Sequence, residues 1–156
     1  MPEVEEFITR ILVFGLPGSG KTTFATKLRE RLDKENIYYA YFNGEEIRKI
    51  FNDQDFKFNG RMQQANRMFQ LCEMSKKGAI ADFVCPYDIM RHPFNYYIWM
   101  NTIEKSAYED TDKIFQKPTH TDHEIKTFDY EDILTTIVNR IKNKWKKEFF
   151  IKHSTW

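Results

Sequence analysis

The chain has 156 residues, of which 41% are hydrophobic and 16% aromatic, so it has the length of one domain and enough apolar material for a core. Twenty-four basic residues stand against 23 acidic ones, and the formal net charge of +1 gives no sign of a nucleic-acid or membrane-binding surface. The sequence shows no membrane-length apolar run and no signal-peptide pattern, and its two isolated cysteines suggest a reducing compartment. We therefore expect a cytoplasmic protein without a membrane partner.

The first part of the chain alternates predicted strands and helices. Apolar residues predict a buried strand over Phe7–Leu16, and residues at helical spacing predict a helix over Lys21–Lys34. A second strand is predicted over Ile37–Phe42, followed by a short helix over Glu45–Phe51. Asn52–Gly60 has the composition of a polar loop that also carries aromatic residues.

The second part of the chain continues this alternation. The predicted elements are a helix over Arg61–Lys77, a strand over Ala79–Cys85, a strand over Tyr96–Met100, an irregular polar segment over Ser106–His123 and a short strand over Glu124–Phe128. Asp129 is the predicted cap of a C-terminal helix whose apolar face is formed by Leu134, Ile137, Val138, Ile141 and Trp145. Strands that alternate with helices predict an α/β fold with a mostly parallel sheet flanked by helices.

A phosphate-binding motif follows the first predicted strand. Residues 15–22 read GLPGSGKT and fit G-x-x-x-x-G-K-[ST] in full, with a strand predicted before the motif and a helix after it. The glycines allow the backbone N–H groups to surround phosphate, and the helix N-terminus adds positive potential. Lys21 would contact the β- and γ-phosphates of ATP, and the Thr22 hydroxyl would bind Mg²⁺. The expected nucleotide-binding residues are Gly15, Pro17, Gly18, Ser19, Gly20, Lys21, Thr22 and Thr23.

Other motifs narrow the class of P-loop protein. The chain has neither the D-x-x-G nor the N-K-x-D motif of a regulatory GTPase, and no apolar run ends in the Asp-Glu pair of a motor ATPase. We therefore predict a three-layer P-loop kinase fold, in one domain over residues 1–156, with a lid-like segment over about 106–123. The acceptor should lie where the second and third strands end, beside the terminal phosphate.

Several motifs after the phosphate loop resemble those of the adenylylsulfate kinase family, in the same order and over about two-thirds of the chain. The family's L-D-G-D-x-[VI]-R is similar to Phe42–Arg48, its F-S-x-x-D-R-x-x-N is similar to Phe58–Gln64, and its I-S-P-Y is matched by Val84–Tyr87. The resemblance implies an enzyme that transfers the γ-phosphoryl group of ATP to the 3′-hydroxyl of adenylyl sulfate, in sulfate assimilation.

The resemblance also implies roles for single residues on the acceptor side. Glu45 stands where the family's Asp meets the acceptor hydroxyl, and Arg48 and Arg61 stand where its arginines hold phosphate and sulfate. Phe58 matches an aromatic residue that stacks on the acceptor's adenine. The remaining expected acceptor-binding residues are Gln64, Arg67, Val84 and Cys85.

The chain departs from the family pattern in ways that leave alternatives open. The family's first Asp is Asn43, and the lid motif with its second adenine-stacking Phe is missing, so Phe115 or Phe128 could supply the second ring. Asp82 could help to hold magnesium or could lie within a strand. Cys85 reads as a small buried residue rather than a nucleophile.

The divergent lid also leaves the acceptor open. The protein could be a kinase for another nucleotide-linked, nucleoside or polynucleotide hydroxyl, or a nucleotide-binding protein without transfer activity. The near-neutral charge argues against nucleic acid as a partner, and a homodimer is possible.

Overall fold

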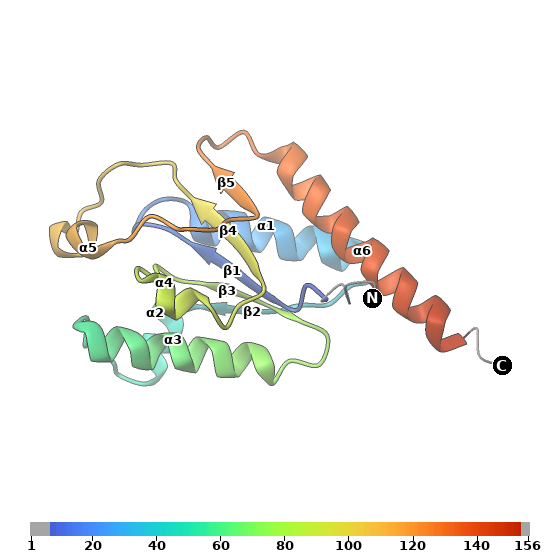
Figure 1. The fold of residues 1–156 in the computed structure, drawn as a ribbon, viewed down its shortest axis with the longest axis horizontal. Coiled ribbons are helices and arrows are strands. Elements are labelled where there is room, and N and C mark those ends of the chain that lie inside the picture. The colour runs from blue at the N-terminus through green and yellow to red at the C-terminus, as the bar shows by residue number, and fades with distance from the viewer. Residues whose placement is uncertain (1–6, 154–156) are drawn as a thin grey trace.

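The computed structural model of the chain describes residues 7–153, with side chains described up to residue 147. Its centre is a five-stranded parallel sheet with the order β2-β3-β1-β4-β5 (Figure 1). The strands are β1 (Arg10–Phe14), β2 (Ala40–Asn43), β3 (Ala79–Asp82), β4 (Tyr96–Met100) and β5 (His123–Ile125). The predicted α/β fold with a parallel sheet is confirmed.

Helices cover both faces of this sheet. They are α1 (Lys21–Lys34), α2 (Gly44–Ile50), α3 (Phe58–Glu73), α4 (Asp88–Arg91), α5 (Glu109–Ile114) and α6 (Glu131–His153). In Figure 1, α1 and α6 lie on one face of the sheet and α2, α3 and α4 on the other. None of the helices in the described part of the chain is long and apolar enough to cross a membrane.

Strand β1 shows why the sequence folds in this way. Ile11 and Val13 belong to the core cluster beneath α1 and α6, whereas Leu12 and Phe14 belong to the cluster beneath α3. Successive side chains of a strand point to opposite faces, so an uninterrupted apolar run is buried on both sides. The apolar stripe of α1, formed by Phe24, Ala25, Leu28 and Leu32, is fully buried as predicted. The predicted face of α6 is also confirmed, with Trp145 half-buried against Tyr39.

Several predicted boundaries were wrong. Helix α3 begins at Phe58 rather than Arg61, so Gly60 does not precede the helix but lies inside its first turn, where a Cβ would collide with Asp55. Strand β3 ends at Asp82 and does not continue to Cys85, whose φ of 46° breaks the extended conformation. Helix α6 begins at Glu131, two residues after the predicted cap Asp129.

The segment predicted to be irregular contains a helix. Residues Ser106–His123 include α5, which lies at the end of the molecule where the strands have their carboxyl ends (Figure 1). Asp112 organises the start of this segment, since its carboxylate accepts hydrogen bonds from the backbone N–H and the hydroxyl of Ser106. The short strand β5 follows at His123–Ile125 rather than at Glu124–Phe128.

Candidate active site

The phosphate loop connects β1 to α1, and its glycines are required by its shape. Gly18 and Gly20 have φ of 82° and 92°, in the left-handed region that favours glycine. At Gly20, a Cβ atom would also lie 2.9 Å from Cε1 of Phe128. The Thr102 hydroxyl donates to the Ser19 carbonyl over 2.7 Å and ties the segment after β4 to the loop. The phosphate loop is therefore in contact with Thr102, after β4, and with Phe128, after β5.

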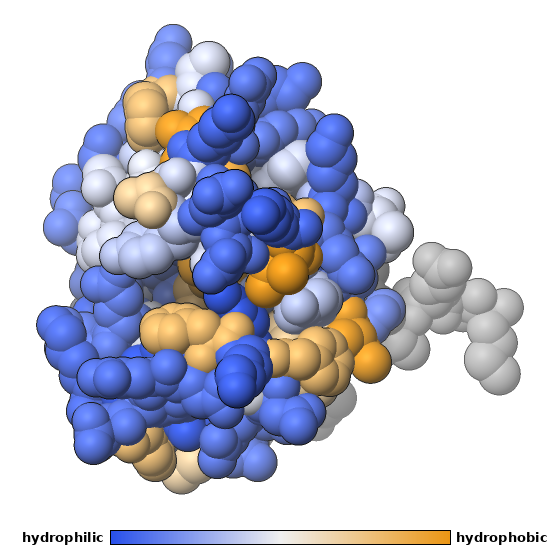
Figure 2. All heavy atoms as spheres, turned by 90° about the vertical axis from the view of Figure 1, so that its left-hand side faces the viewer, coloured by the Kyte–Doolittle hydropathy of each residue, from blue (hydrophilic) through white to orange (hydrophobic). Residues whose placement is uncertain are grey.

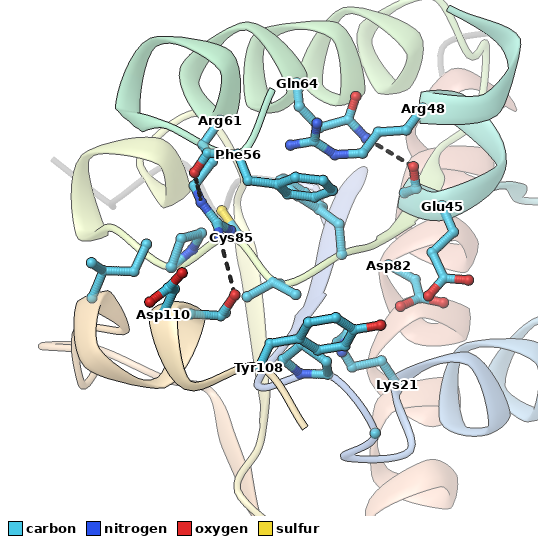
Figure 3. Close-up of a pocket in the computed structure, with 18 of the residues that line it drawn as sticks. Lys21, Glu45, Arg48, Phe56, Arg61, Gln64, Asp82, Cys85, Tyr108 and Asp110 are labelled. Carbon is cyan, nitrogen blue, oxygen red and sulfur yellow. Dashed lines mark hydrogen bonds between the residues drawn. The ribbon is translucent and has the colours of Figure 1, made fainter. Parts of the chain in front are cut away.

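Lys21 begins α1 and turns back over the loop. Its Nζ donates to the Leu16 carbonyl over 2.9 Å. Burial lowers the pKa of Lys21 below its usual value, while the nearby carboxylates of Asp82 and Glu45 act in the opposite direction. The ammonium group is thus placed at the loop with two acidic groups nearby (Figure 3).

Asp82 is the last residue of β3 and lies beside the phosphate loop. The sequence had left open whether this residue lies at the end of a strand or within it. It is only 2% exposed, and its Oδ2 accepts hydrogen bonds from the Thr22 hydroxyl at 2.8 Å, the Tyr41 hydroxyl at 2.6 Å and Asn43 Nδ2 at 3.0 Å. Burial and the contact with Asp82 raise the pKa of Tyr41 to about 12, so this phenol stays protonated. A sequence signal existed, because the apolar run Ala79–Ala81 ends abruptly in Asp82.

A pocket of about 1360 Å³ opens next to the phosphate loop. Figure 2 views the molecule from the end where α5 lies, and apolar side chains gather there around a recess in a largely hydrophilic surface. The pocket is lined from the loop, from the start of α2, from residues 54–58 before and at the start of α3, from the segment after β3 and from α5. Phosphate-loop and acceptor-side residues therefore share one cavity.

Most of the predicted site residues line this pocket. The predicted residues in its lining are Pro17, Gly18, Gly20, Lys21, Thr22, Thr23, Glu45, Arg48, Phe58, Arg61, Gln64, Val84 and Cys85. Three predicted residues do not line it, namely Gly15, Ser19 and Arg67. Gly15 and Ser19 still belong to the phosphate loop, and the buried Ser19 Oγ has no hydrogen-bond partner among the described residues. Burial raises the pKa of the Cys85 thiol, which favours the neutral thiol over the nucleophilic thiolate.

The two pocket arginines are held by the protein itself. Arg48 Nη1 lies 3.2 Å from the Asp53 carboxylate and donates to the Asp55 carbonyl over 3.1 Å. Arg61 donates from Nε to the Phe56 carbonyl at 2.6 Å and from Nη2 to the Thr111 hydroxyl at 3.1 Å. Burial lowers the pKa of both guanidinium groups below its usual value.

Arg67 lies behind the pocket, in contact with the pocket residue Gln64. Its Nη1 donates to Gln64 Oε1 at 2.7 Å and pairs with Asp53 at 3.2 Å. Gln64, which is 2% exposed, donates in turn from Nε2 to the Gly44 carbonyl at 2.9 Å. Arg67 does not line the pocket, and its contact with Gln64 orients that side chain.

Two aromatic residues of the pocket were missed by the sequence reasoning. Phe56 and Tyr108 are 55% and 63% exposed, and in Figure 3 their rings lie on opposite sides of the pocket. The Arg48 guanidinium lies over the Phe56 ring at 4.2 Å from its centre. Phe58, 49% exposed, packs edge-on against Tyr87.

The aromatic residues suggested for the missing second ring lie elsewhere. Phe115 packs against Phe14 and Arg91 in the core cluster beneath α3. Phe128 is exposed beside Gly20 and does not line the pocket. Neither of them faces Phe58 across the pocket.

The residues at the loop fit a magnesium ion. The Thr22 hydroxyl and the Asp82 carboxylate supply hard oxygen donors next to each other, which Mg²⁺ prefers. The three hydrogen bonds to Asp82 all go to Oδ2, so Oδ1 takes part in none of them.

Comparison with known proteins gives a consistent picture. The family model for adenylylsulphate kinase matches residues 8–120, whereas no curated protein matches the sequence significantly. Among solved structures, APE1195 is 21% identical with a TM-score of 0.67, covering 90% of this chain and 97% of its own. The Mycobacterium tuberculosis APS kinase CysC in complex with AMPPNP and APS is 12% identical with a TM-score of 0.67, covering 88% of this chain and 99% of its own.

A gluconokinase from Sinorhizobium meliloti 1021 has a lower TM-score of 0.56 at 12% identity, covering 96% of this chain and 100% of its own. At these identities the solved structures support the P-loop kinase fold, and the family model supports assignment to a family. Because that model matches well over half of the chain, the protein belongs to the adenylylsulphate kinase family, whose members are ATP-dependent phosphotransferases that act on a hydroxyl group.

Proposed function

We propose that the protein transfers the γ-phosphoryl group of ATP to the 3′-hydroxyl of adenylyl sulfate, and so works in sulfate activation in the cytoplasm. The observation that carries this proposal is the shared pocket, in which the phosphate loop meets Glu45, two arginines and exposed aromatic rings. A kinase needs donor phosphate and acceptor hydroxyl in one cavity that excludes water. Aromatic rings and arginines suit an acceptor with a base and two anionic groups.

The reaction would be an in-line displacement. The acceptor oxygen forms a bond to the γ-phosphorus while the bond from that phosphorus to the β–γ bridging oxygen breaks, and ADP leaves. Glu45 accepts the proton of the acceptor hydroxyl, and Lys21 neutralises charge that develops on the phosphates. Glu45 suits this role better than Asp82, whose carboxylate is already engaged by three donors.

Magnesium belongs to this proposal as the ion that accompanies ATP. Thr22 and Asp82 would hold it, directly or through bound water, and it would supply charge neutralisation between the β- and γ-phosphates. Lys21 and the loop N–H groups would hold the same phosphates from the other side.

The solved structure of the M. tuberculosis enzyme supports the choice of acceptor, since it is a complex with AMPPNP and APS. In the present chain, Phe56 and Tyr108 would receive the adenine of the acceptor between their rings. Arg48 and Arg61 would meet its phosphate and sulfate groups.

An acceptor panel with γ-labelled ATP and Mg²⁺ tests the proposal. The panel contains adenylyl sulfate, AMP, adenosine, gluconate and a 5′-hydroxyl oligonucleotide, and transfer is measured as label in each acceptor. We expect label in adenylyl sulfate at a rate far above that in the others. Absence of label in adenylyl sulfate, with ATP demonstrably bound, would remove it as the acceptor.

A second candidate is a kinase of the same scaffold for a less anionic hydroxyl acceptor. The observation that favours it is the charge balance of the pocket, because Asp53 already pairs with Arg48. The α5 segment brings the acidic residues Glu109 and Asp110 into the lining. Preferred labelling of adenosine or gluconate in the same panel would select this candidate.

A further inference from the structure

Asp82 and Asn43 occupy matched positions at the ends of two neighbouring strands. They are register partners across the β2–β3 pair, so their side chains leave the sheet next to each other. Asn43 Nδ2 lies 3.0 Å from Asp82 Oδ2 and 3.2 Å from Thr22 Oγ1. The amide of Asn43 thus touches both residues that would hold magnesium.

Tyr41 reaches the same carboxylate from two residues earlier in β2. Side chains at i and i+2 of a strand share one face, which brings Tyr41 and Asn43 to Asp82 together. The Tyr41 hydroxyl donates to Asp82 Oδ2 at 2.6 Å, and Asn43 Nδ2 lies 3.5 Å from the Tyr41 hydroxyl oxygen. The Tyr41 ring packs at the edge of the core cluster beneath α1 and α6, which fixes the phenol in place.

We propose that Tyr41 and Asn43 are positioning residues, which orient Asp82 for the magnesium ion that accompanies the bound nucleotide. This inference rests on the proposed kinase function only for the presence of that ion. Three donors on Oδ2 fix the plane of the carboxylate, and none of these hydrogen bonds uses Oδ1, which would remain available to the metal or its water. Partners of this kind set ligand orientation and metal affinity.

The choice of an amide at position 43 follows from the same geometry. A carboxylate there would place two negative groups within hydrogen-bonding distance and would provide no donor to Asp82. Asn43 also caps α2, because its Oδ1 accepts from the Glu46 backbone N–H at 3.1 Å. One side chain thereby joins the start of α2, which carries Glu45, to the metal side of the phosphate loop.

Metal binding measured without an acceptor tests the proposal. Mn²⁺ replaces Mg²⁺ as a spectroscopic probe, and its affinity for the ADP complex is measured by electron paramagnetic resonance in the full-length protein. Tyr41→Phe removes one donor and keeps the ring. Tyr38→Phe is the matched control, since Tyr38 is exposed and its hydroxyl donates to Asn36, away from Asp82. We expect Tyr41→Phe to weaken Mn²⁺ binding about tenfold and Tyr38→Phe to leave it unchanged.

Asn43→Ser is the second variant, because serine keeps a capping oxygen for α2 but is too short to reach Asp82. It should weaken Mn²⁺ binding to a similar extent, whereas the metal-free affinity for ADP should stay at the wild-type value in both variants. Unchanged Mn²⁺ affinity in both variants would overturn the proposal. A parallel loss of metal-free ADP affinity would also overturn it, since the two residues would then shape the loop itself. These binding measurements can be interpreted even if no acceptor is labelled in the kinase assay, because they involve no acceptor.

Discussion

Glu45 and Asp82 are two carboxylates that lie near Lys21 but are held differently. Asp82 is buried under three hydrogen bonds, whereas Glu45 projects from the first turn of α2 at the edge of the pocket (Figure 3). A base must exchange its proton with a bound substrate, and a residue that orients metal must stay ionised and fixed. This difference in surroundings supports our proposal that Glu45 accepts the proton and that Asp82 helps to hold the metal.

Glu45→Gln tests this division of roles. Glutamine keeps the shape of the side chain but accepts no proton, so we expect phosphoryl transfer to fall by about 100-fold or more. The affinity for ATP, measured by calorimetry, should stay within about twofold because the loop contacts are unaffected. Glu46→Gln is the matched control, as the neighbouring carboxylate does not line the pocket. Full transfer activity in Glu45→Gln would exclude Glu45 as the base.

Because of Lys21, we expect the affinity for nucleotide to depend on pH in the alkaline range. Burial lowers the pKa of its ammonium group in the free protein, and bound phosphates favour the charged form. Nucleotide affinity should therefore decline as the pH rises through this lowered pKa, at a lower pH than the one at which a free lysine side chain titrates. Calorimetric titration with an ATP analogue between neutral pH and about pH 10 measures the decline.

Lys21→Arg is the control for this pH dependence, because a guanidinium group stays charged throughout the range. Its affinity is expected to be lower at neutral pH but flat with rising pH. An identical alkaline decline in Lys21→Arg would assign the effect to another group.

At the scale of elements, α5 is fastened to α3 through one buried contact. Arg61, 7% exposed, donates to the hydroxyl of Thr111, which is the buried residue of α5. Tyr108 and Asp110, which shortly precede Thr111 in the chain, line the pocket. We therefore expect this bond to fix the position of the α5 residues that line the pocket.

Thr111→Val removes this bond with little change of volume. A buried donor left without its partner costs about 1–3 kcal/mol, so chemical denaturation should show a loss of stability within that range. The KM for the acceptor should rise several-fold while the affinity for ATP is retained. Thr136→Val, on an exposed turn of α6, is the matched control and should change neither quantity. An unchanged acceptor KM in Thr111→Val would separate α5 from acceptor binding.

Local and long-range features differed in how well the sequence predicted them. The phosphate loop was predictable because its motif, the strand before it and the helix after it are contiguous in the chain. Asp82 was left undecided because its role depends on where β3 ends and on the register with β2. Phe56 and Tyr108 were missed because they come from two segments read as loops, which only the folded chain brings to one pocket.

The order of the strands explains the position of the site in the whole molecule. Strands β1 and β3 are adjacent in the centre of the sheet (Figure 1). Residues at or shortly after their carboxyl ends line the pocket. In open parallel sheets, ligands bind in the crevice outside these ends. The phosphate loop follows β1, and the acceptor-side residues follow β2 and β3. The residues for the phosphate donor and those for the acceptor therefore lie at the same edge of the sheet.

A crystal structure of the protein with a non-hydrolysable ATP analogue, Mg²⁺ and adenylyl sulfate tests the central claim most directly. We predict the phosphates on the loop with Lys21, the 3′-hydroxyl within hydrogen-bonding distance of the Glu45 carboxylate, and the acceptor adenine between Phe56 and Tyr108. An acceptor bound outside the pocket, or a 3′-hydroxyl directed away from the γ-phosphate, would contradict the account.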